Sequence, residues 1–492
     1  MTVSRRRFLS WAASVSALTV AGRRGLRAVP LPAVDIAAFQ PSLLPSQQAV
    51  WEQQWWMAKL GPKYTGNAAH TTFVEFIAKE LQTAGLDVER LHYTFPRWEA
   101  RRWELTVAPA GGAPFKAPVT SYFPYSGQTP ASGVTGDLTF AGSNPKFTLD
   151  GLSGKVALVD FATNVRDWSR VYKTWGLNPP GETFPASLRP ARGAVNNLTE
   201  FQKAGAVAVI LAWTDVSDAN AADQYTPFSR PPQGIPGLYV GRDTGARLKA
   251  LAASGAKATV VLEAQTFPDT PTDSLIATLP GTSSDEIVIV NTHTDGPNAT
   301  EENGALGIIA LAKYFSKLPK SARKRTLVFP LTSGHFASPW VPSIRGVIEK
   351  RPELIKKAVA AVTVEHLGCL EWMDDAAGRY RATGKNEWSV AITPDASMGA
   401  IMVDALKGSR DRAAAVNPAN GGWLGEGGGL SRAGIPTIGY IPQPNYLLAG
   451  PADGCIDKLS PELLHSQIAV FAKVLHAIDA ASAADLKGDR TR

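Results

Sequence analysis

The stretch Ile287-Val288-Ile289-Val290-Asn291-Thr292-His293-Thr294-Asp295-Gly296 decides the fold. Its first four residues are β-branched and apolar, a run typical of a strand that is buried on both faces. Polar residues and a glycine follow directly, and an amphipathic run near Ala305–Phe315 indicates a helix. Because a buried strand, a polar turn and a helix form the repeating unit of parallel sheets, this stretch predicts an α/β fold.

The same unit recurs along the C-terminal half of the chain. Apolar runs predict strands at Ser274–Leu279, Ile287–Asn291, Arg325–Pro330, Ala360–Val364, Trp388–Ile392 and Thr437–Tyr440. Amphipathic runs predict helices near Ala305–Phe315, Pro342–Arg351, Ser397–Leu406 and Pro461–Ala480. We therefore expect a mostly parallel or mixed sheet that is sandwiched by helices.

The chain before residue 271 divides into three further parts. Residues 1–28 read as a leader, and residues 29–108 carry two helical runs followed by two alternating runs typical of strands. From residue 109 to 270, short apolar runs are separated by glycines and prolines, which predicts an inserted β-rich domain. The main α/β domain is thus expected to combine residues 29–108 with residues 271–492.

The leader contains the run Ser4-Arg5-Arg6-Arg7-Phe8-Leu9, followed by a short apolar stretch from Trp11 to Gly22. This pattern is typical of a twin-arginine export signal, and the apolar stretch is too short for a stable membrane anchor. The formal charge of +7 falls to +1 when the six arginines of the leader are left out. We expect a periplasmic or secreted protein, with no electrostatic reason for a nucleic-acid partner.

Polar side chains follow three of the predicted strands. His293 and Asp295 come after the first, His335 after the second, and Glu365 with His366 after the third. Since ligands of open α/β sheets bind beyond the carboxyl ends of the strands, these residues are candidates for a functional site. Cys369 and Cys455 are 86 residues apart and are expected to form either one disulfide or two buried thiols.

These motifs resemble those of the zinc aminopeptidases, the family that also contains bacterial leucyl aminopeptidases, glutaminyl cyclases and plasma glutamate carboxypeptidase. The resemblance implies that His293 binds zinc and that Asp295 orients it. It also implies that Glu302, followed by Asn303, takes the place of a bridging acid and that Glu365 is a further ligand. The runs around residues 154–160 and 196–211 similarly resemble the protease-associated domain, which implies that fold for the insert.

The chain also departs from the pattern of this family. His335 and Phe336 stand where the family has two consecutive glutamates, one of them catalytic, and Tyr446 stands near the place of its last histidine ligand. The resemblance therefore implies one zinc ion or none, held by His293, Glu302 and Glu365, with room for a water molecule.

The resemblance implies hydrolysis of a peptide or amide bond, by a divergent, mono-metal peptidase or amidohydrolase. His335 is the expected general base, since imidazole has a suitable pKa. Glu301 or Glu426 would bind a substrate amine or position the water, and His366 would assist at the metal.

Two other functions fit the same residues. A metal-free glycoside hydrolase needs paired carboxylates and flat aromatic surfaces for a carbohydrate substrate. The chain offers these as Glu301, Glu302, Glu365, Glu371 and Glu426, with Trp340, Trp372, Trp423 and Tyr446. A catalytically inactive binding protein on the same fold is the other alternative, because fold does not determine function.

Overall fold

The computed structural model describes residues 38–167, 172–176, 183–190, 197–228, 230–418 and 422–487. The predicted leader at residues 1–28 lies outside these ranges. Within them, no helix combines the length and the apolar character that crossing a bilayer requires. Both cysteines are buried free thiols, so the described part of the chain contains no Cys369–Cys455 disulfide.

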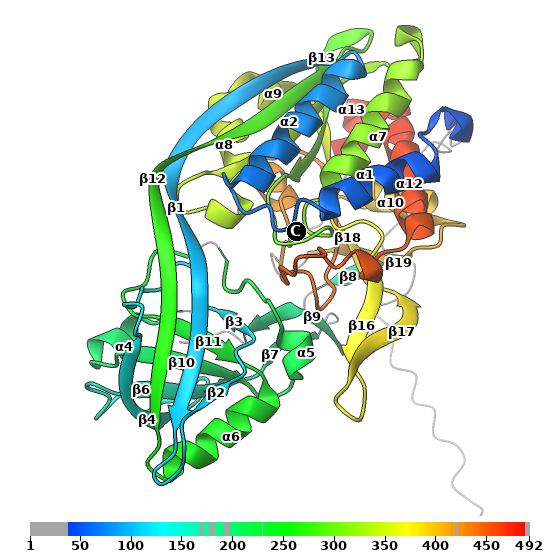
Figure 1. Ribbon diagram of the computed structural model, residues 1–492. Helices are drawn as coiled ribbons and strands as arrows, with labels where there is room; N and C mark the ends of the chain where they lie inside the picture. The colour runs from blue at the N-terminus through cyan, green and yellow to red at the C-terminus, as the bar shows by residue number, and fades with distance from the viewer. Residues whose placement is uncertain are drawn as a thin grey trace, which may run out of the picture. The chain divides into compact units, whose positions relative to one another are not determined.

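Sixteen strands of the described residues belong to one mixed sheet (Figure 1). The path through it runs in the order β3-β11-β10-β6-β4-β12-β14-β13-β15-β20-β18-β19-β8, with β1, β2 and β5 pairing at its sides. The strands that carry the C-terminal half are β13 (Ser283–His293), β14 (Arg325–Thr332), β15 (Ala358–Val364), β18 (Trp388–Ile392), β19 (Arg412–Asn417) and β20 (Thr437–Pro442). Strand β13 is parallel to both β14 and β15, and β15 is parallel to β20.

Helices cover both faces of this part of the sheet. One face is covered by α1 (Gln47–Ala58), α2 (Ala68–Thr83), α7 (Gly304–Lys317), α10 (Ala396–Leu406) and α12 (Pro461–Ala480). The other face is covered by α8 (Ser343–Lys350), α9 (Pro352–Lys357) and α11 (Gly427–Arg432). Short helices complete the domain: η2 (Pro41–Leu43), η4 (Lys320–Ala322), η5 (His335–Ala337), η6 (Ile456–Lys458) and α13 (Ala483–Lys487).

Strand β13 shows why its sequence folds this way. Val288 and Val290 pack into the core that contains α7 and α12, whereas Ile287 and Ile289 pack into the core beneath α8 and α11. Successive side chains of a strand point to opposite faces, so a strand with helices on both faces needs apolar residues at every position. The predicted α/β fold with a helix-covered, mostly parallel or mixed sheet is confirmed.

Two very long strands connect this domain with the inserted segment. Strand β1 (Asp87–Ala108) pairs with β12 (Lys257–Leu279) in antiparallel register along almost their whole lengths (Figure 1). Register shifts near Phe95 and Ala100 interrupt the ladder, as β-bulges do. The sequence indicated two separate strands in place of β1, because its central residues include charged side chains that break the apolar alternation.

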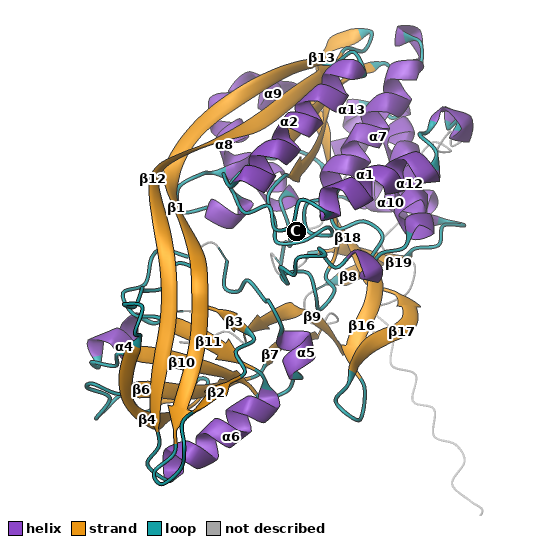
Figure 2. Cartoon of the chain, viewed as in Figure 1, coloured by secondary structure: helices purple, strands orange, loops and turns teal. Residues whose placement is uncertain are grey.

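The segment between β1 and β12 contributes its own strands and helices (Figure 2). Its strands are β2 (Phe115–Ala117), β3 (Ser121–Tyr122), β4 (Val134–Ser143), β5 (Lys146–Phe147), β6 (Val156–Phe161), β7 (Thr163–Asp167), β8 (Lys173–Gly176), β9 (Thr183–Pro190), β10 (Ala208–Trp213) and β11 (Gly237–Val240). Its helices are α4 (Thr199–Lys203), α5 (Asp218–Ala221) and α6 (Arg242–Ala253). Strands β4, β6, β10 and β11 are parallel and pack two apolar cores of their own. Its likeness to a protease-associated domain stays a prediction.

A hairpin of β16 (Leu370–Asp374) and β17 (Tyr380–Asn386) follows β15 and is absent from the sequence-based assignment. Strand β17 is mostly exposed and polar, so it lacks the apolar pattern that predicts a strand. Asp374 at the end of β16 accepts hydrogen bonds from the backbone N–H and the hydroxyl of Ser217, at 2.8 and 2.7 Å. The hairpin thereby ties the inserted segment to the main domain.

Candidate metal centre

Three buried side chains meet beyond the carboxyl ends of β13 and β15. His293 ends β13, Glu301 lies in the turn before α7, and His366 follows β15. Each side chain is at most 2% exposed, and one ligand atom of each lies within 4.8 Å of the others. The Nε2 atom of His366 is 3.1 Å from Oε2 of Glu301. Two imidazoles and one carboxylate are a known ligand set of catalytic zinc.

Backbone carbonyls determine the orientation of both rings. The Nδ1 atom of His293 is 2.9 Å from the carbonyl oxygen of Asp295, and Nδ1 of His366 is 2.8 Å from that of Pro442. A carbonyl can only accept, so each Nδ1 carries a proton and each Nε2 is left to point into the cluster. Nε2 of His293 is buried and has no hydrogen-bond partner, whereas the buried Nε2 of His366 pairs with the Glu301 carboxylate. Metal-binding histidines are commonly held in this way, so these residues fit a metal ion.

The charges within the cluster favour the same ligand roles. Burial lowers the pKa of His293 to about 4, so its Nε2 bears a lone pair at neutral pH. Burial alone would raise the pKa of Glu301, but the three neighbouring imidazoles lower it to about 2 and keep this group charged. Burial lowers the pKa of His366, yet the Glu301 carboxylate offsets this and raises it. A proton and a metal ion therefore compete for this nitrogen.

Close backbone packing positions the turn that carries Glu301. A Cβ atom at Gly304 would lie 2.0 Å from the carbonyl oxygen of Val364, so only glycine lets α7 begin this close to β15. The side chain of Asn298 accepts hydrogen bonds from the N–H groups of Thr300 and Glu301, at 2.8 and 3.0 Å. Its amide group donates to three carbonyl oxygens of the segment 446–449, which fixes the turn to the C-terminal part of the chain.

A second pair of titratable groups, His335 and Glu426, lies against this cluster. The ring of His335 stacks on that of His293 with centroids 4.2 Å apart, and its Nε2 is 3.8 Å from Oε1 of Glu301. Its Nδ1 is 2.8 Å from Oε1 of Glu426. The other carboxylate oxygen of Glu426 accepts hydrogen bonds from the Ser343 hydroxyl at 2.7 Å and from the Ile344 N–H at 3.2 Å.

The charges of His335 and Glu426 stabilise each other. Burial opposes ionisation of both groups, but the Glu426 carboxylate raises the pKa of His335 to about 9. The same interaction lowers the pKa of Glu426 to about 2. A cation bound at the cluster would repel the imidazolium and bring the pKa of His335 back toward neutrality. The arrangement suits a group that holds and moves a proton at Nε2.

Glu302, a predicted metal ligand, lies apart from the three clustered residues. Its Oε1 is 2.7 Å from Nζ of Lys63, and both side chains are fully buried. Lys63 also donates to the carbonyl oxygen of Gly61 at 2.8 Å. Neighbouring residues point in different directions in a helical turn, so Glu301 faces the histidines and Glu302 faces the ammonium group. Burial raises the pKa of Glu302 to about 7.

Glu365, the other predicted ligand, lies at the edge of the cluster. Its Oε1 is 3.8 Å from Nε2 of His293 and accepts a hydrogen bond from the Glu426 N–H at 3.1 Å. Burial raises its pKa to about 7. A Cβ atom at Gly425 would lie 1.8 Å from Oε2 of this carboxylate, so the loop must have a glycine there, and its φ of +71° favours one as well.

Asp295 and Asn303 position the site through contacts that the sequence did not reveal. The carboxylate of Asp295 accepts from the Thr65 hydroxyl at 2.6 Å and from the Phe336 N–H at 2.8 Å, and only its backbone carbonyl bonds to His293. Asn303 accepts from the Leu367 N–H and donates to the Leu367 carbonyl, both at 2.7 Å. It therefore holds the loop that carries His366.

The predicted aromatic residues make other contacts. Tyr446 is 1% exposed, and its hydroxyl lies 2.9 Å from the backbone carbonyl oxygens of Leu370 and Lys458. Trp423 packs closely on the backbone of the glycines at 427, 428 and 439. Trp340 packs against Phe95 and Tyr125 and lines a separate cavity of about 230 Å³. Lys63, which sequence reasoning missed, belongs to no motif and lies far from Glu302 along the chain.

Comparison with known proteins supports the fold. In sequence, neither a family model nor a curated protein matches the chain. Among solved structures, it is similar to a peptidase M28 precursor from Shewanella amazonensis SB2B, with a TM-score of 0.62 and 18% identity over 90% of this chain and 98% of that one. A zinc aminopeptidase from Bacillus subtilis gives a TM-score of 0.60 and 18% identity over 90% and 98%. An aminopeptidase from Aneurinibacillus sp. strain AM-1 gives 0.56 and 16% over 90% and 96%. The predicted likeness to zinc aminopeptidases is thus confirmed at the level of the fold.

Proposed function

We propose that this chain is a metal-dependent hydrolase of peptide or amide bonds that uses one metal ion, bound by His293, Glu301 and His366. The observation that carries the proposal is the orientation of the two rings. Each ring donates its Nδ1 proton to a backbone carbonyl and keeps a buried Nε2 in the cluster with Glu301, and that of His366 already pairs with this carboxylate. The fold shared with solved aminopeptidases supports the choice of bond.

Zinc bound to such a set supplies Lewis-acid polarisation of a carbonyl oxygen and acidification of a water molecule. The residues of the chain then have to move protons. His335 accepts the proton of the attacking water at Nε2 and passes it to the leaving amine. Glu426 keeps the ring in place through Nδ1 and stabilises its positive charge, while Ser343 and the Ile344 N–H hold Glu426.

Only one ion is proposed because the charge of Glu302 is already balanced. The Lys63 ammonium group lies 2.7 Å from this carboxylate, with both groups fully buried, so a second cation would meet a positive charge there. The proposal therefore replaces the predicted ligands Glu302 and Glu365 with Glu301 and His366. Glu365, next to His293, is available to position a substrate amine or a water molecule.

The proposal includes export through the twin-arginine route, supported by the run Ser4–Leu9 of the leader. This route carries folded proteins, so a metal centre would be assembled before export. The mature chain would act in the periplasm or outside the cell on a small-molecule or peptide substrate. Fractionation of cells that express the full chain tests this part, with a variant in which Arg5, Arg6 and Arg7 are lysines. Loss of export in that variant is expected, and equal export would contradict the route.

The reaction is tested with a panel of aminoacyl and peptidyl amides. The intact chain should hydrolyse at least one of them, lose activity with chelator and regain it with added zinc. His335→Ala should lower kcat by about 10²–10⁴-fold while the metal content stays unchanged. An exposed histidine, His92, provides the matched control, and His92→Ala should behave as the wild type.

Other outcomes separate the alternatives. Hydrolysis of glycosides that ignores chelator would contradict the proposal and indicate the metal-free reaction of paired glutamates. Absence of turnover on both classes, with no metal bound, would indicate a binding protein.

A further inference from the structure

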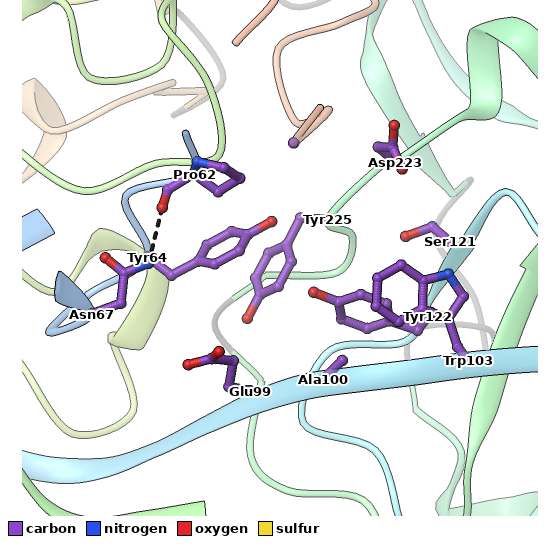
Figure 3. Close-up of a pocket in the computed structure, with 11 residues that line it drawn as sticks. Pro62, Tyr64, Asn67, Glu99, Ala100, Trp103, Ser121, Tyr122, Asp223 and Tyr225 are labelled. Carbon is purple, nitrogen blue, oxygen red and sulfur yellow. Dashed lines mark hydrogen bonds between the residues drawn. The ribbon is translucent and has the colours of Figure 1, made fainter. Parts of the chain in front are cut away.

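A cavity of about 270 Å³ opens beside the candidate metal centre (Figure 3). It combines aromatic rings with carboxylates, and the residues that shape it most are Tyr64, Trp103, Tyr122, Tyr225, Glu99 and Asp223. Its volume lies just under the roughly 300–1,000 Å³ of ordinary small-molecule sites. The space is therefore suited to one side chain or one small head group.

The rings form a continuous aromatic wall. Tyr64 stacks on Tyr225 with centroids 4.2 Å apart, and Tyr122 meets Tyr225 edge-on at 6.1 Å. The ring centroids of Trp103 and Tyr122 are 4.7 Å apart. In Figure 3 the three tyrosine rings lie next to one another, with Glu99 and Asp223 on either side of them. Aromatic faces of this kind attract cations through their quadrupoles.

The two carboxylates of the cavity differ in their partners. Glu99 already forms an ion pair with Arg97 and another with Arg101, the latter at 2.6 Å. Asp223 is exposed, and none of the described basic side chains forms an ion pair with it. Partial desolvation at the cavity and the nearby Asp453 carboxylate raise the pKa of Asp223. The uncompensated charge at this cavity is thus negative and belongs to Asp223, with Asp453 beside it.

The backbone holds Asp223 rigidly at this place. Its N–H donates to the carbonyl oxygen of Thr120 at 2.7 Å, and its own carbonyl accepts from the Gly450 N–H at 2.9 Å. Its φ of +57° lies in the left-handed region, which aspartate and asparagine tolerate better than most residues. These backbone contacts fix the point from which the Asp223 side chain enters the lining of the cavity.

The cavity is connected to the candidate metal centre by two short segments. Tyr64 stands between Lys63, the partner of Glu302, and Thr65, which donates to Asp295. Phe336, the residue after His335, places its ring 6.5 Å from that of Tyr64 and 5.9 Å from that of Tyr225. Phe336 therefore packs against the rings of this cavity, which places the cavity next to the residue that follows His335.

We propose that this cavity binds an organic cation, an alkylammonium or guanidinium group, between the tyrosine rings and Asp223. In a substrate, this cation is the side chain of a basic residue near the bond that is cleaved. The second statement rests on the proposed function, whereas the first does not depend on it.

Isothermal titration of the full chain with n-butylammonium, n-butylguanidinium and uncharged n-butanol tests the binding. At least one cation should bind about tenfold or more tightly than n-butanol. The two cations distinguish a lysine-like from an arginine-like ligand. Asp223→Asn should weaken cation binding by about tenfold without changing the backbone, since asparagine accepts the same positive φ. Tyr225→Leu should weaken it by about fivefold.

The control removes a negative charge elsewhere. Asp285 is 89% exposed in its side chain, so Asp285→Asn should leave cation binding unchanged. Equal binding of n-butanol and both cations, or unchanged binding in Asp223→Asn, would overturn the proposal.

A repeat of the titrations in chelator separates this proposal from the metal-dependent reaction. Cation binding should be the same with and without chelator. Loss of cation binding when the metal is removed would overturn the proposal that the tyrosine rings and Asp223 bind the cation. The substrate part is tested with peptides that differ at one position. The value of kcat/KM should be about tenfold higher with lysine or arginine there than with norleucine, and this preference should vanish in Asp223→Asn. If amide hydrolysis fails, the result of the cation titration still stands. If the titration fails, the proposed metal centre is not affected.

Discussion

Replacement of Lys63 by methionine should destabilise the protein strongly. Both Lys63 and Glu302 are fully buried, with Nζ and Oε1 2.7 Å apart, so the variant leaves a carboxylate in the interior without its counter-ion. Removal of one partner from a buried ion pair costs about 3–5 kcal/mol of unfolding free energy. We expect the loss to approach this size well above pH 7, where the Glu302 carboxylate is charged in the wild type, measured by urea unfolding followed through tryptophan fluorescence.

The loss should depend on pH in a definite direction. Burial already raises the pKa of Glu302 to about 7, and removal of the ammonium group raises it further. Above the unfolded value of about 4.5, the folded state then holds a proton that the unfolded state has released, so stability falls as pH rises. The difference between Lys63→Met and the wild type should therefore be smallest below about pH 7, where Glu302 holds its proton in both proteins, and should grow above pH 7.

Two further variants test the reasoning behind this prediction. Lys63→Met combined with Glu302→Gln should recover most of the lost stability, because a neutral pair needs no counter-ion. Lys116→Met removes an ammonium group that is 73% exposed and should change stability far less. A Lys63→Met variant no less stable than Lys116→Met would refute the buried ion pair, as would a double variant no more stable than the single one.

Three other predictions follow from buried contacts. Burial lowers the pKa of His70 to about 4, so stability should fall by about 3 kcal/mol as pH drops from 6.5 to 4, and His70→Gln should flatten this fall in acid-unfolding curves. Gly304→Ala should lower the unfolding free energy by about 1–3 kcal/mol in urea, because its Cβ would lie 2.0 Å from the Val364 carbonyl. Asn303→Ala should weaken zinc affinity in competition titrations by about 10–100-fold, because both hydrogen bonds to Leu367 are lost.

Each of these three predictions would be contradicted by a specific experimental result. The control is His92→Gln, which changes an exposed histidine. If His70→Gln and His92→Gln gave the same acid-unfolding curve, the pKa of His70 would not differ between the folded and the unfolded state. A Cβ atom at Gly112 would lie 3.5 Å from the nearest atom, an ordinary contact, so equal stability of Gly304→Ala and Gly112→Ala would contradict the close packing of α7. Wild-type zinc affinity in Asn303→Ala would show that Asn303 does not position His366.

The fold could be predicted where one residue pattern decides each element. Runs such as Ile287–Val290 are apolar at every position because helices cover both faces of the sheet, and this pattern is legible in the sequence. Strand β17 is exposed and polar, and the middle of β1 is charged, so neither carries such a pattern. Their strand conformation depends on pairing: the partners of β17 lie 6 to 16 residues away and those of β1 on β12 lie 149 to 191 residues away, and neither pairing shows in the apolar pattern.

The candidate site was predictable as a region but not as a ligand set. Parallel strands place His293, His335, Glu365 and His366 at one edge, which the order of strands and helices already implied. The choice between Glu301 and its neighbour Glu302 depends on where Lys63 lies, and that contact joins residues 239 positions apart. The role of Asp295 likewise depends on its backbone carbonyl, an atom that is the same in every residue type.

The zinc content of Glu301→Gln compared with Glu302→Gln tests the central claim most directly. Elemental analysis of the purified wild-type chain should give about one zinc per molecule, with none retained by Glu301→Gln and an unchanged content in Glu302→Gln, because only the first carboxylate faces His293 and His366. Zinc retained by Glu301→Gln and lost from Glu302→Gln would contradict this assignment of the metal centre, and a wild-type chain without zinc would contradict the centre itself.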